Sequence, residues 1–315
     1  IYTFLGSVLM LVALIYLHFQ THSFEIEKFY ALSLPLNVQL WLFIAFFLAF
    51  AVKVPMWPFH TWLPDAHTAA PAGGSVVLAA LMLKVGVYGF LRFSMPIAPM
   101  ANQLLDGWVI ALALVAIVYI GILAIMQKDM KKLIAYSSIA HMGFAVLGCY
   151  MVYNIMNVTG SHSEAYLSFE GAVVQMISHA FSTGGMFLAV GILQYKVGSR
   201  LIKDFGGVAK TMPVFAAFFM LFSLANVGLP GTSGFVGEFM IIIAAMHANF
   251  WVALLAGSTL VIAAGYTLWM YKRVFFGEVI SDKVAALGDI GKFEIFIFGM
   301  LAAAILFIGF YPQWL

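Results

Sequence analysis

Long apolar runs constrain the fold of this chain more than any other feature. A helix needs about 20 apolar residues to cross the roughly 30 Å hydrocarbon core of a bilayer. About nine runs approach or exceed that length, and they cover residues 2–18, 40–63, 73–93, 107–126, 133–153, 171–195, 212–246 with an interruption after 225, 250–271 and 293–311. Short polar turns separate them. We therefore predict an all-α integral membrane protein, a polytopic bundle of about nine transmembrane helices without a separate soluble domain.

The charge content supports a membrane location and excludes several functions. Only 9% of the 315 residues are charged, against about 25% in soluble domains, so the chain cannot cover a water-facing surface. A net charge of +2 implies no nucleic-acid partner. The single cysteine, Cys149, excludes a disulfide framework, a four-cysteine iron–sulfur site and a structural zinc knuckle within this chain. Ile1 opens an apolar run without a charged leader, and we expect an N-terminally truncated fragment rather than a signal peptide.

The distribution of lysine and arginine predicts the topology. The turns at 127–132, 196–211 and 272–292 are basic, whereas the segment 154–170 has neither residue and contains Glu164 and Glu170. Basic turns face the cytoplasm in most membrane proteins. Every second turn therefore lies on the cytoplasmic side, or on its equivalent in a mitochondrion.

Two of the apolar spans are interrupted by helix-breaking residues. In AFAVKVPMWPFHTWLPDAH, residues 49–67, a helical pattern runs into Lys53 and then meets Pro55 and Pro58. Proline has no N–H, so a carbonyl near Ala51 loses its helical partner. Lipid tolerates this only where the backbone is buried in protein or lines a wet cavity.

The second interruption lies in ANVGLPGTSGFVGEF, which contains Pro230 and Gly231. Both broken spans carry an ionisable residue. That combination is typical of inverted-repeat transporters, in which the ion path passes the breaks.

Ionisable residues inside the spans are few, and such residues usually mark a functional path. The candidates for proton translocation are Lys53, Lys84, His179 and Glu238, with His60 and His141 less central. Each has a simpler interpretation. Lys53 could reach an interface along its own stem, and Lys84 could form a structural ion pair, although it lies too deep to reach an interface easily.

The remaining candidates also have structural alternatives. His179 could be a packing histidine satisfied by Ser178 or Gln175, His141 could hydrogen-bond to Ser137 one turn earlier, and Glu238 could cap a half-helix. Together the set is more specific than its members. Burial disfavours the charged form of a lysine, and a nearby carboxylate favours that form again. Histidine titrates near neutral pH. We therefore predict a lateral proton relay, and the residues lack the clustered ligands of a selective metal site.

Three segments carry a resemblance to a known family. They read KVPMWPFHTWLPDAHTAAPAGGSVVLAALMLKVGVYGFLRF, KDMKKLIAYSSIAHMGF and GLPGTSGFVGEFMI. The chain resembles, over essentially its whole length, the antiporter-like, proton-translocating membrane subunits of respiratory complex I, the NADH:quinone oxidoreductase. Within that family it is most similar to subunit M, also called chain 4. The discriminating residue is Glu238, because related subunits usually have lysine in the second broken helix.

The resemblance implies a division of the chain. The family has fourteen helices built from two inverted five-helix repeats. Residues 1–93 then correspond to the end of the first repeat, with its broken helix at 40–63. Residues 107–271 correspond to the second repeat, with its broken helix at 212–246, and 293–315 to the C-terminal helix.

The resemblance also implies roles for four residues. Lys53 matches the lysine of the first broken helix, Lys84 the connecting lysine, His179 a central-axis histidine and Glu238 the terminal acid of the second broken helix. One feature departs from the family: the glutamate that partners Lys53 lies on an earlier helix there, whereas Glu25 and Glu27 are expected in a turn.

The expected function is therefore proton translocation in the membrane arm of complex I. This chain would hold no redox centre, and FMN, iron–sulfur clusters and quinone would belong to partner subunits. Its partners would be other membrane-arm subunits, including paralogous antiporter-like ones, and lipids, in a bacterial plasma membrane or mitochondrial inner membrane. The alternatives are an Mrp-type cation/proton antiporter subunit, a homologous subunit of a photosynthetic complex I or membrane-bound hydrogenase, and a scaffold that does not pump.

Overall fold

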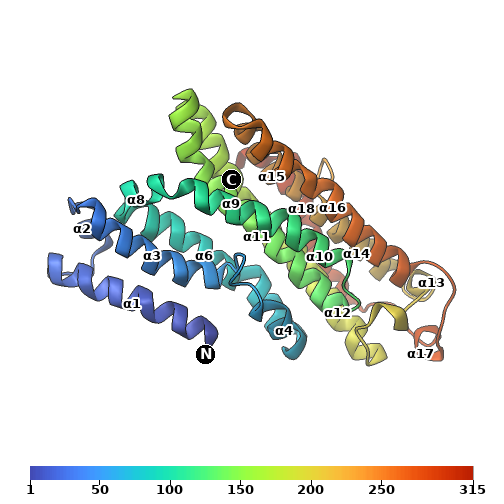
Figure 1. Cartoon of the computed structure of the whole chain (residues 1–315). Helices are drawn as coiled ribbons and strands as arrows, with labels where there is room; N and C mark the ends of the chain where they lie inside the picture. The colour runs from blue at the N-terminus through green and yellow to red at the C-terminus, as the bar shows by residue number, and fades with distance from the viewer. Residues whose placement is uncertain (315) are drawn as a thin grey trace.

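The computed structural model describes residues 1–314 and shows a bundle of helices (Figure 1). Within those residues, extended pairing is limited to one isolated bridge between Asp129 and Leu201. Eight helices are long and apolar enough to cross a membrane. Two shorter apolar helices, Pro213–Val227 and Ser233–Ala248, follow one another and form a ninth, broken span. The prediction of about nine spans in an all-α membrane bundle is confirmed.

The first broken span differs in its limits from the predicted 40–63. Helix α3 spans Leu36–Lys53, and the half-helix α4 spans Trp62–Ala69. Pro55 has no N–H to donate to the Ala51 carbonyl. That carbonyl accepts a hydrogen bond from the Met56 N–H at 2.8 Å instead. The Trp62 indole donates to the Val52 carbonyl at 3.0 Å. The backbone groups freed by the break are thus satisfied within the protein, as a position at membrane depth requires.

The next two spans contain three π-helical turns, which the sequence did not predict. The span Ala72–Ile97 consists of α5 (Ala72–Val77), α6 (Leu83–Gly89) and α7 (Met95–Ile97), with the π-helical turns η1 (Leu78–Met82) and η2 (Phe90–Ser94) between them. The span Asp106–Ile125 contains the π-helical turn η3 (Ala116–Ile120) between α9 (Asp106–Val115) and α10 (Gly121–Ile125). A short helix, α8 (Pro99–Leu104), joins the two spans. Each π-helical turn shifts the register of the backbone hydrogen bonds and re-aims the side chains around it.

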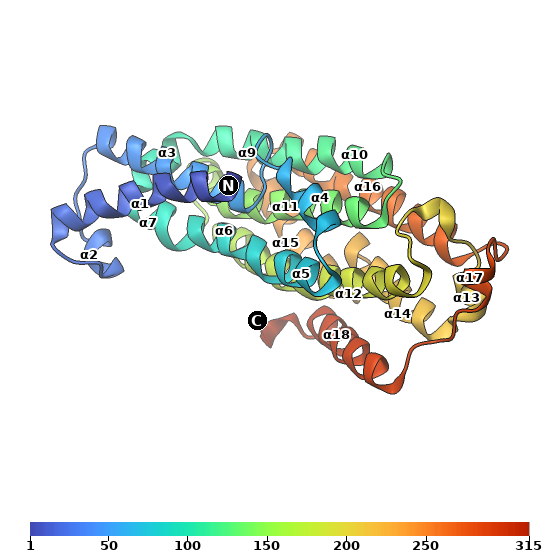
Figure 2. The same ribbon diagram turned by 90° about the horizontal axis from the view of Figure 1, so that it is seen from below.

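Two long antiparallel helices form the centre of the molecule (Figures 1 and 2). They are α11 (Met130–Thr159) and α12 (His162–Val197). Most of the segment 154–170, which lies between the predicted spans 133–153 and 171–195, is helical, because both helices extend into it and leave only Gly160 and Ser161 between them. Gly160 has φ +65°, and the Ser161 side chain accepts from the Glu164 N–H, so one glycine and one N-cap make the whole turn.

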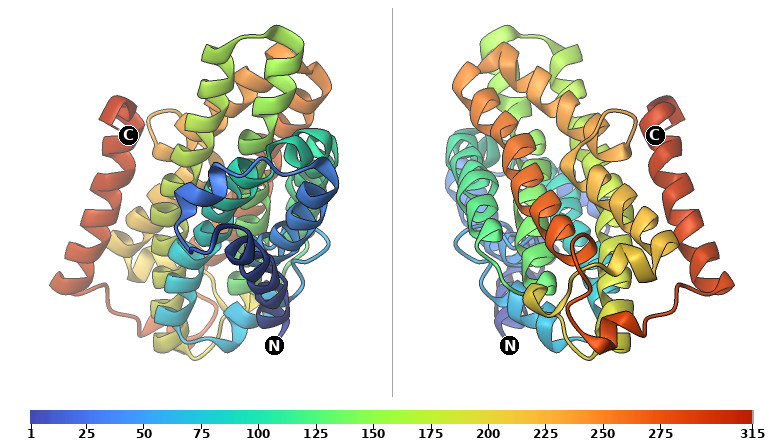
Figure 3. Two further views of the ribbon diagram at one scale, coloured as in Figure 1. Left: turned by 90° about the vertical axis from the view of Figure 1, so that its left-hand side faces the viewer. Right: turned by 90° about the vertical axis from the view of Figure 1, so that its right-hand side faces the viewer.

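The C-terminal third carries the second break and two further spans. Helix α14 (Pro213–Val227) is capped by Gly228. The turn that follows contains Pro230 and Gly231, and α15 (Ser233–Ala248) begins after it. The other elements of this part are α16 (Phe250–Phe275), α18 (Lys292–Phe310) and the short helices η4 (Ile202–Asp204), α13 (Val208–Thr211), α17 (Asp282–Ala285) and η5 (Pro312–Trp314). Figure 3 shows α18 standing at one flank, where it packs against α12, α14 and α15.

The basic turns meet at one end of the bundle, as the charge pattern predicted. Ile202 N–H donates to the Lys128 carbonyl at 3.0 Å, and Gly207 N–H donates to the Phe276 carbonyl at 3.1 Å. The turn of the α11–α12 hairpin lies at the opposite end, where Glu164 approaches His247 at 3.3 Å. Which end faces the cytoplasm stays a prediction.

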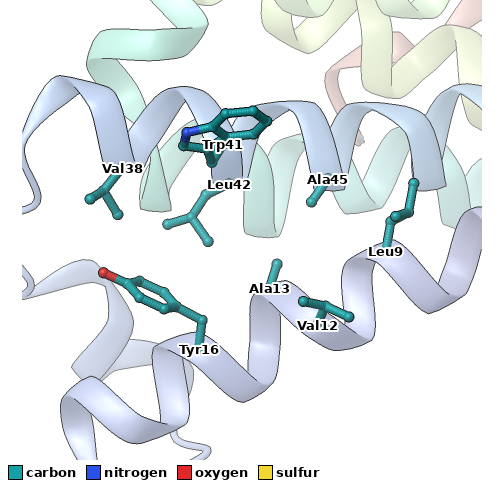
Figure 4. Close-up of a pocket in the computed structure, with 8 residues that line it drawn as sticks. All are labelled: Leu9, Val12, Ala13, Tyr16, Val38, Trp41, Leu42 and Ala45. Carbon is teal, nitrogen blue, oxygen red and sulfur yellow. The ribbon is translucent and has the colours of Figure 1, made fainter.

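An apolar groove of about 340 Å³ separates α1 (Tyr2–Thr21) from α3 (Figure 4). Leu9, Val12 and Tyr16 line one side, and Val38, Trp41 and Leu42 the other. None of the ionisable candidates lines this groove. It is therefore separate from the site described below.

Candidate functional site

The site forms where α12 and α15 cross at very short range. A Cβ atom on Gly237 of α15 would lie 2.7 Å from the backbone nitrogen of Gln175 on α12. A Cβ on Gly171 would lie 3.1 Å from the Gly237 carbonyl oxygen. Two glycines thus remove the side chains that would keep the helices apart. The next residue on α15, Glu238, is consequently pressed against α12.

Glu238 is buried, with 2% of its surface exposed, and has neighbours on two helices. The Gln175 side-chain amide donates to Glu238 Oε1 at 3.0 Å. His141 Nε2 on α11 lies 3.4 Å from the same oxygen. On the other side, a Cβ on Gly228 would lie 2.8 Å from Oε2, so the glycine that ends α14 also makes room for the carboxyl group. The sequence suggested Gln175 as a possible hydrogen-bond partner of His179, but its side-chain amide donates to Glu238 instead.

His141 is more central than the sequence suggested. Its Nδ1 lies 2.8 Å from the Ser137 carbonyl and its Nε2 lies 3.0 Å from the Asn226 carbonyl. Carbonyls only accept hydrogen bonds. An imidazole ring that donates to both carbonyls must therefore carry a proton on each nitrogen, and with it a positive charge. When the ring releases one proton, one carbonyl loses its donor. The simple hydrogen bond expected one turn back exists, but nothing in the local sequence indicates the contacts to Asn226 and Glu238.

Lys84 and His179 form the other half of the site. Lys84 Nζ lies 2.6 Å from His179 Nδ1 and donates to the Ala79 carbonyl at 2.6 Å. Ala79 lies in the π-helical turn η1, five residues before Lys84. When Lys84 is an ammonium group it donates to Nδ1, and the ring proton of His179 then lies on Nε2.

The two halves are close enough to form one line of titratable groups. The ring centres of His179 and His141 are 5.6 Å apart. The order is therefore Lys84, His179, His141 and Glu238, taken from α6 (Leu83–Gly89), α12, α11 and α15. The structure thus brings four of the six sequence candidates together.

Lys53 and His60 lie in and beside the first break, outside this line. Lys53 ends α3 and is half-buried. A Cβ on Gly86 would lie 3.1 Å from Lys53 Cβ, so the lysine packs beside the helix that carries Lys84. His60 is buried within the break itself. In the part of the chain that the structure describes, no hydrogen bond links His60 to the four residues.

Sequence reasoning missed His67, which closes the motif LPDAH. It lies on α4 and is fully buried, and its ring stacks on Phe187 of α12 with ring centres 4.3 Å apart. Within residues 1–314, neither ring nitrogen has a hydrogen-bond partner. The sequence does contain an indication of this residue, because His67 follows His60 by seven residues, about two helical turns.

We expect Gly237→Ala to separate the two halves of the site. The added methyl group meets the Gln175 backbone rather than a flexible side chain, and overpacking of this kind costs about 1–3 kcal/mol. The melting temperature should fall, and transport at matched protein level should fall with it. Gly257→Ala on α16 is the matched control, because its Cβ would meet nothing within 4 Å. Equal behaviour of the two variants would show that the close crossing is unimportant.

Comparison with protein families identifies the chain. The model of the family described as "NADH:quinone oxidoreductase/Mrp antiporter, TM" matches residues 1–263, which is more than half of the sequence. The chain belongs to this family. It is a multi-pass integral membrane protein, as the eight long apolar helices also indicate.

Within the NADH:quinone oxidoreductase/Mrp antiporter family, the chain is similar to proteins named subunit M or chain 4. The chain is 46% identical over 326 residues to NADH-quinone oxidoreductase subunit M of Rhodobacter capsulatus, covering 99% of this chain and 61% of that protein. It is 40% identical over 313 residues to NADH-ubiquinone oxidoreductase chain 4 of Marchantia polymorpha, with the same shares covered. The resemblance to subunit M and chain 4 is confirmed. The chain spans about three fifths of the length of these curated relatives.

Solved structures agree on the fold. A chain of respiratory complex I from Thermus thermophilus with bound NADH superimposes with a TM-score of 0.88 at 33% identity, covering 99% of this chain and 64% of that one. The Mrp complex from Dietzia sp. DQ12-45-1b contains a chain with a TM-score of 0.84 at 19% identity, covering the same shares. At that identity the second match shows the shared fold alone.

Proposed function

We propose that the chain moves protons as part of a membrane-arm subunit of an NADH:quinone oxidoreductase. This proposal rests on one observation: four titratable residues from four different helices lie in a line, in the order Lys84, His179, His141 and Glu238. Each member accepts or releases a proton by ordinary acid–base chemistry. The similarity to subunit M at 46% identity supports the choice of assembly.

Transfer along the line passes between neighbouring groups. The Lys84 ammonium group gives a proton to His179 Nδ1, which lies 2.6 Å away. The ring releases its other proton from Nε2, which has no protein partner within residues 1–314, to a water that we place between the two histidine rings, and this water protonates His141. The His141 ring passes a proton to Glu238 from Nε2, which lies 3.4 Å from the carboxyl oxygen. Polar atoms around this end have no protein partner within residues 1–314, among them Gln175 Oε1, Tyr266 Oη and Glu238 Oε2. Buried polar atoms are as a rule hydrogen-bonded to protein or water, so we place a short water chain here.

Lys53 supplies or receives protons at the first break in this proposal. The chain itself performs no electron transfer, and FMN, iron–sulfur clusters and quinone belong to partner subunits. Its neighbours are other membrane-arm subunits and lipids of an energy-transducing membrane.

The test is proton uptake by vesicles that contain the assembled complex, started with NADH and a soluble quinone. We expect uptake to follow quinone reduction and to be unaffected when sodium is replaced by choline. Dependence of uptake on sodium would favour a cation/proton antiporter subunit. Unchanged uptake after loss of each of the four relay residues would favour a scaffold that does not pump.

A further inference from the structure

The outer end of α4 is held by cations from distant parts of the chain. Helix α4 is only eight residues long, and its last carbonyls cannot continue into a helix because Ala70 is extended and Pro71 follows. The Arg200 Nη1 donates to the Thr68 carbonyl at 2.7 Å. The Lys131 ammonium group donates to the Ala70 carbonyl at 3.0 Å. Both cations also oppose the negative end of the helix dipole.

The other carbonyls of this end are satisfied locally. Thr68 Oγ1 donates to the Asp65 carbonyl at 2.8 Å, Ala70 N–H to the Ala66 carbonyl at 2.9 Å, and Ser75 Oγ to the His67 carbonyl at 3.1 Å. The two cations therefore serve the carbonyls that local donors do not reach. An unpaired carbonyl that is buried away from water is costly, so these cations matter for where the half-helix can end.

Asp129 holds the Arg200 side chain and caps the helix that carries Lys131. As N-cap of α11, its Oδ1 accepts from the Lys131 N–H at 2.8 Å, and its Oδ2 accepts from Arg200 Nε. Arg200 thus reaches Asp129 and Thr68 with different nitrogens of one planar group, which a lysine cannot do. A further pair, Lys132 with Asp65 at 2.9 Å, is largely exposed and contributes little.

The anchored half-helix carries His67 against α12, the helix that bears His179. We propose that Arg200 and Lys131 are positioning residues for transport. They fix the end of α4, and through it the place of His67 beside the relay, without touching Lys84 or His179. This inference rests on the proposed function, because it assigns the anchor a purpose in proton movement.

The position of α4 can be measured directly in the assembled complex. Spin labels at Ala69 and Tyr195, exposed residues of α4 and α12, should give one narrow distance distribution. Arg200→Met should broaden or shift it and lower proton uptake per assembled complex by roughly tenfold or more, because the charge-assisted hydrogen bonds to Asp129 and to the Thr68 carbonyl are both lost. Arg200→Lys should lie between, because an ammonium group serves one of the two partners at a time. Lys203→Met, an exposed lysine in the same turn, should change neither measurement.

The outcomes separate positioning from other roles. An unchanged distance distribution in Arg200→Met and in Lys131→Met, with transport lowered, would overturn the proposal, since the cations would then act on protons themselves. A shifted distribution with full transport would overturn it as well. If Arg200→Met does not assemble, Arg200→Lys decides on the same two measurements. Equal proton uptake by the unsubstituted complex and by Glu238→Gln would count against the proposed function, while the label distances would still report on the anchor.

Discussion

Replacing Glu238 with glutamine will leave the subunit assembled and remove most of its proton transport. Glutamine has nearly the same shape and can still accept the hydrogen bond from Gln175 at the present position of Oε1. It cannot receive a proton from His141, which lies 3.4 Å away. Removing a positioned acid–base group lowers rates by roughly a hundredfold or more, so redox-driven uptake should fall at least tenfold.

Glu238→Asp should keep part of the activity. Its carboxyl group still titrates, but the side chain is one methylene shorter and cannot reach both Gln175 and His141. Uptake should lie between those of the glutamate and glutamine forms at matched assembly. Glu170→Gln, which alters an exposed carboxylate on α12, is the control for lost charge. If Glu238→Gln pumps like the unsubstituted protein, the residue only caps α15.

Lys84→Ala will interrupt the line at its other end. The substitution removes the group that lies 2.6 Å from His179 Nδ1 and leaves the Ala79 carbonyl without its donor. Proton uptake should fall by roughly tenfold or more, because the titratable group at the start of the relay, which lies against His179, is lost. Lys84→Arg should not restore it, since a guanidinium group does not release its proton in proteins.

The control for Lys84 lies next to it. Val85 is 52% exposed on the same helix, and Val85→Ala removes side-chain volume without altering a titratable group. The measurement is uptake per assembled complex for all three variants. Full activity of Lys84→Arg would mean that the lysine provides a fixed positive charge, which would exclude it from proton transfer.

Much of the fold could be predicted from local sequence, because a span in lipid needs a long apolar run whatever surrounds it. The prolines at 55, 58 and 230 located both breaks correctly. The limits of α11 and α12 could not be read from apolar runs, since polar helix-forming residues extend them beyond the membrane. The pair Ser161 and Glu164, an N-cap with its partner three residues later, was the overlooked indication of the short turn.

The site was only partly predictable. Depth in an apolar run singled out Lys84 and Glu238, because burial of charge is costly anywhere in a span. The importance of His141 depends on Asn226, 85 residues away, and on a glycine crossing that brings Glu238 beside it. The π-helical turn that contains Ala79 leaves no mark in the composition. Contacts of this kind follow from tertiary packing, which no single stretch of sequence encodes.

The lengths of α11 and α12 make one end of the molecule accessible for engineering. At 1.5 Å per residue, their 30 and 36 residues extend about 45 and 54 Å, whereas the hydrocarbon layer is about 30 Å thick. Allowing for tilt, the hairpin tip at Gly160 stands in water, and nothing lies within 4 Å of a Cβ placed there. A peptide tag or fluorophore inserted at this tip would report on the orientation and mobility of the two helices that carry His141 and His179, far from either residue.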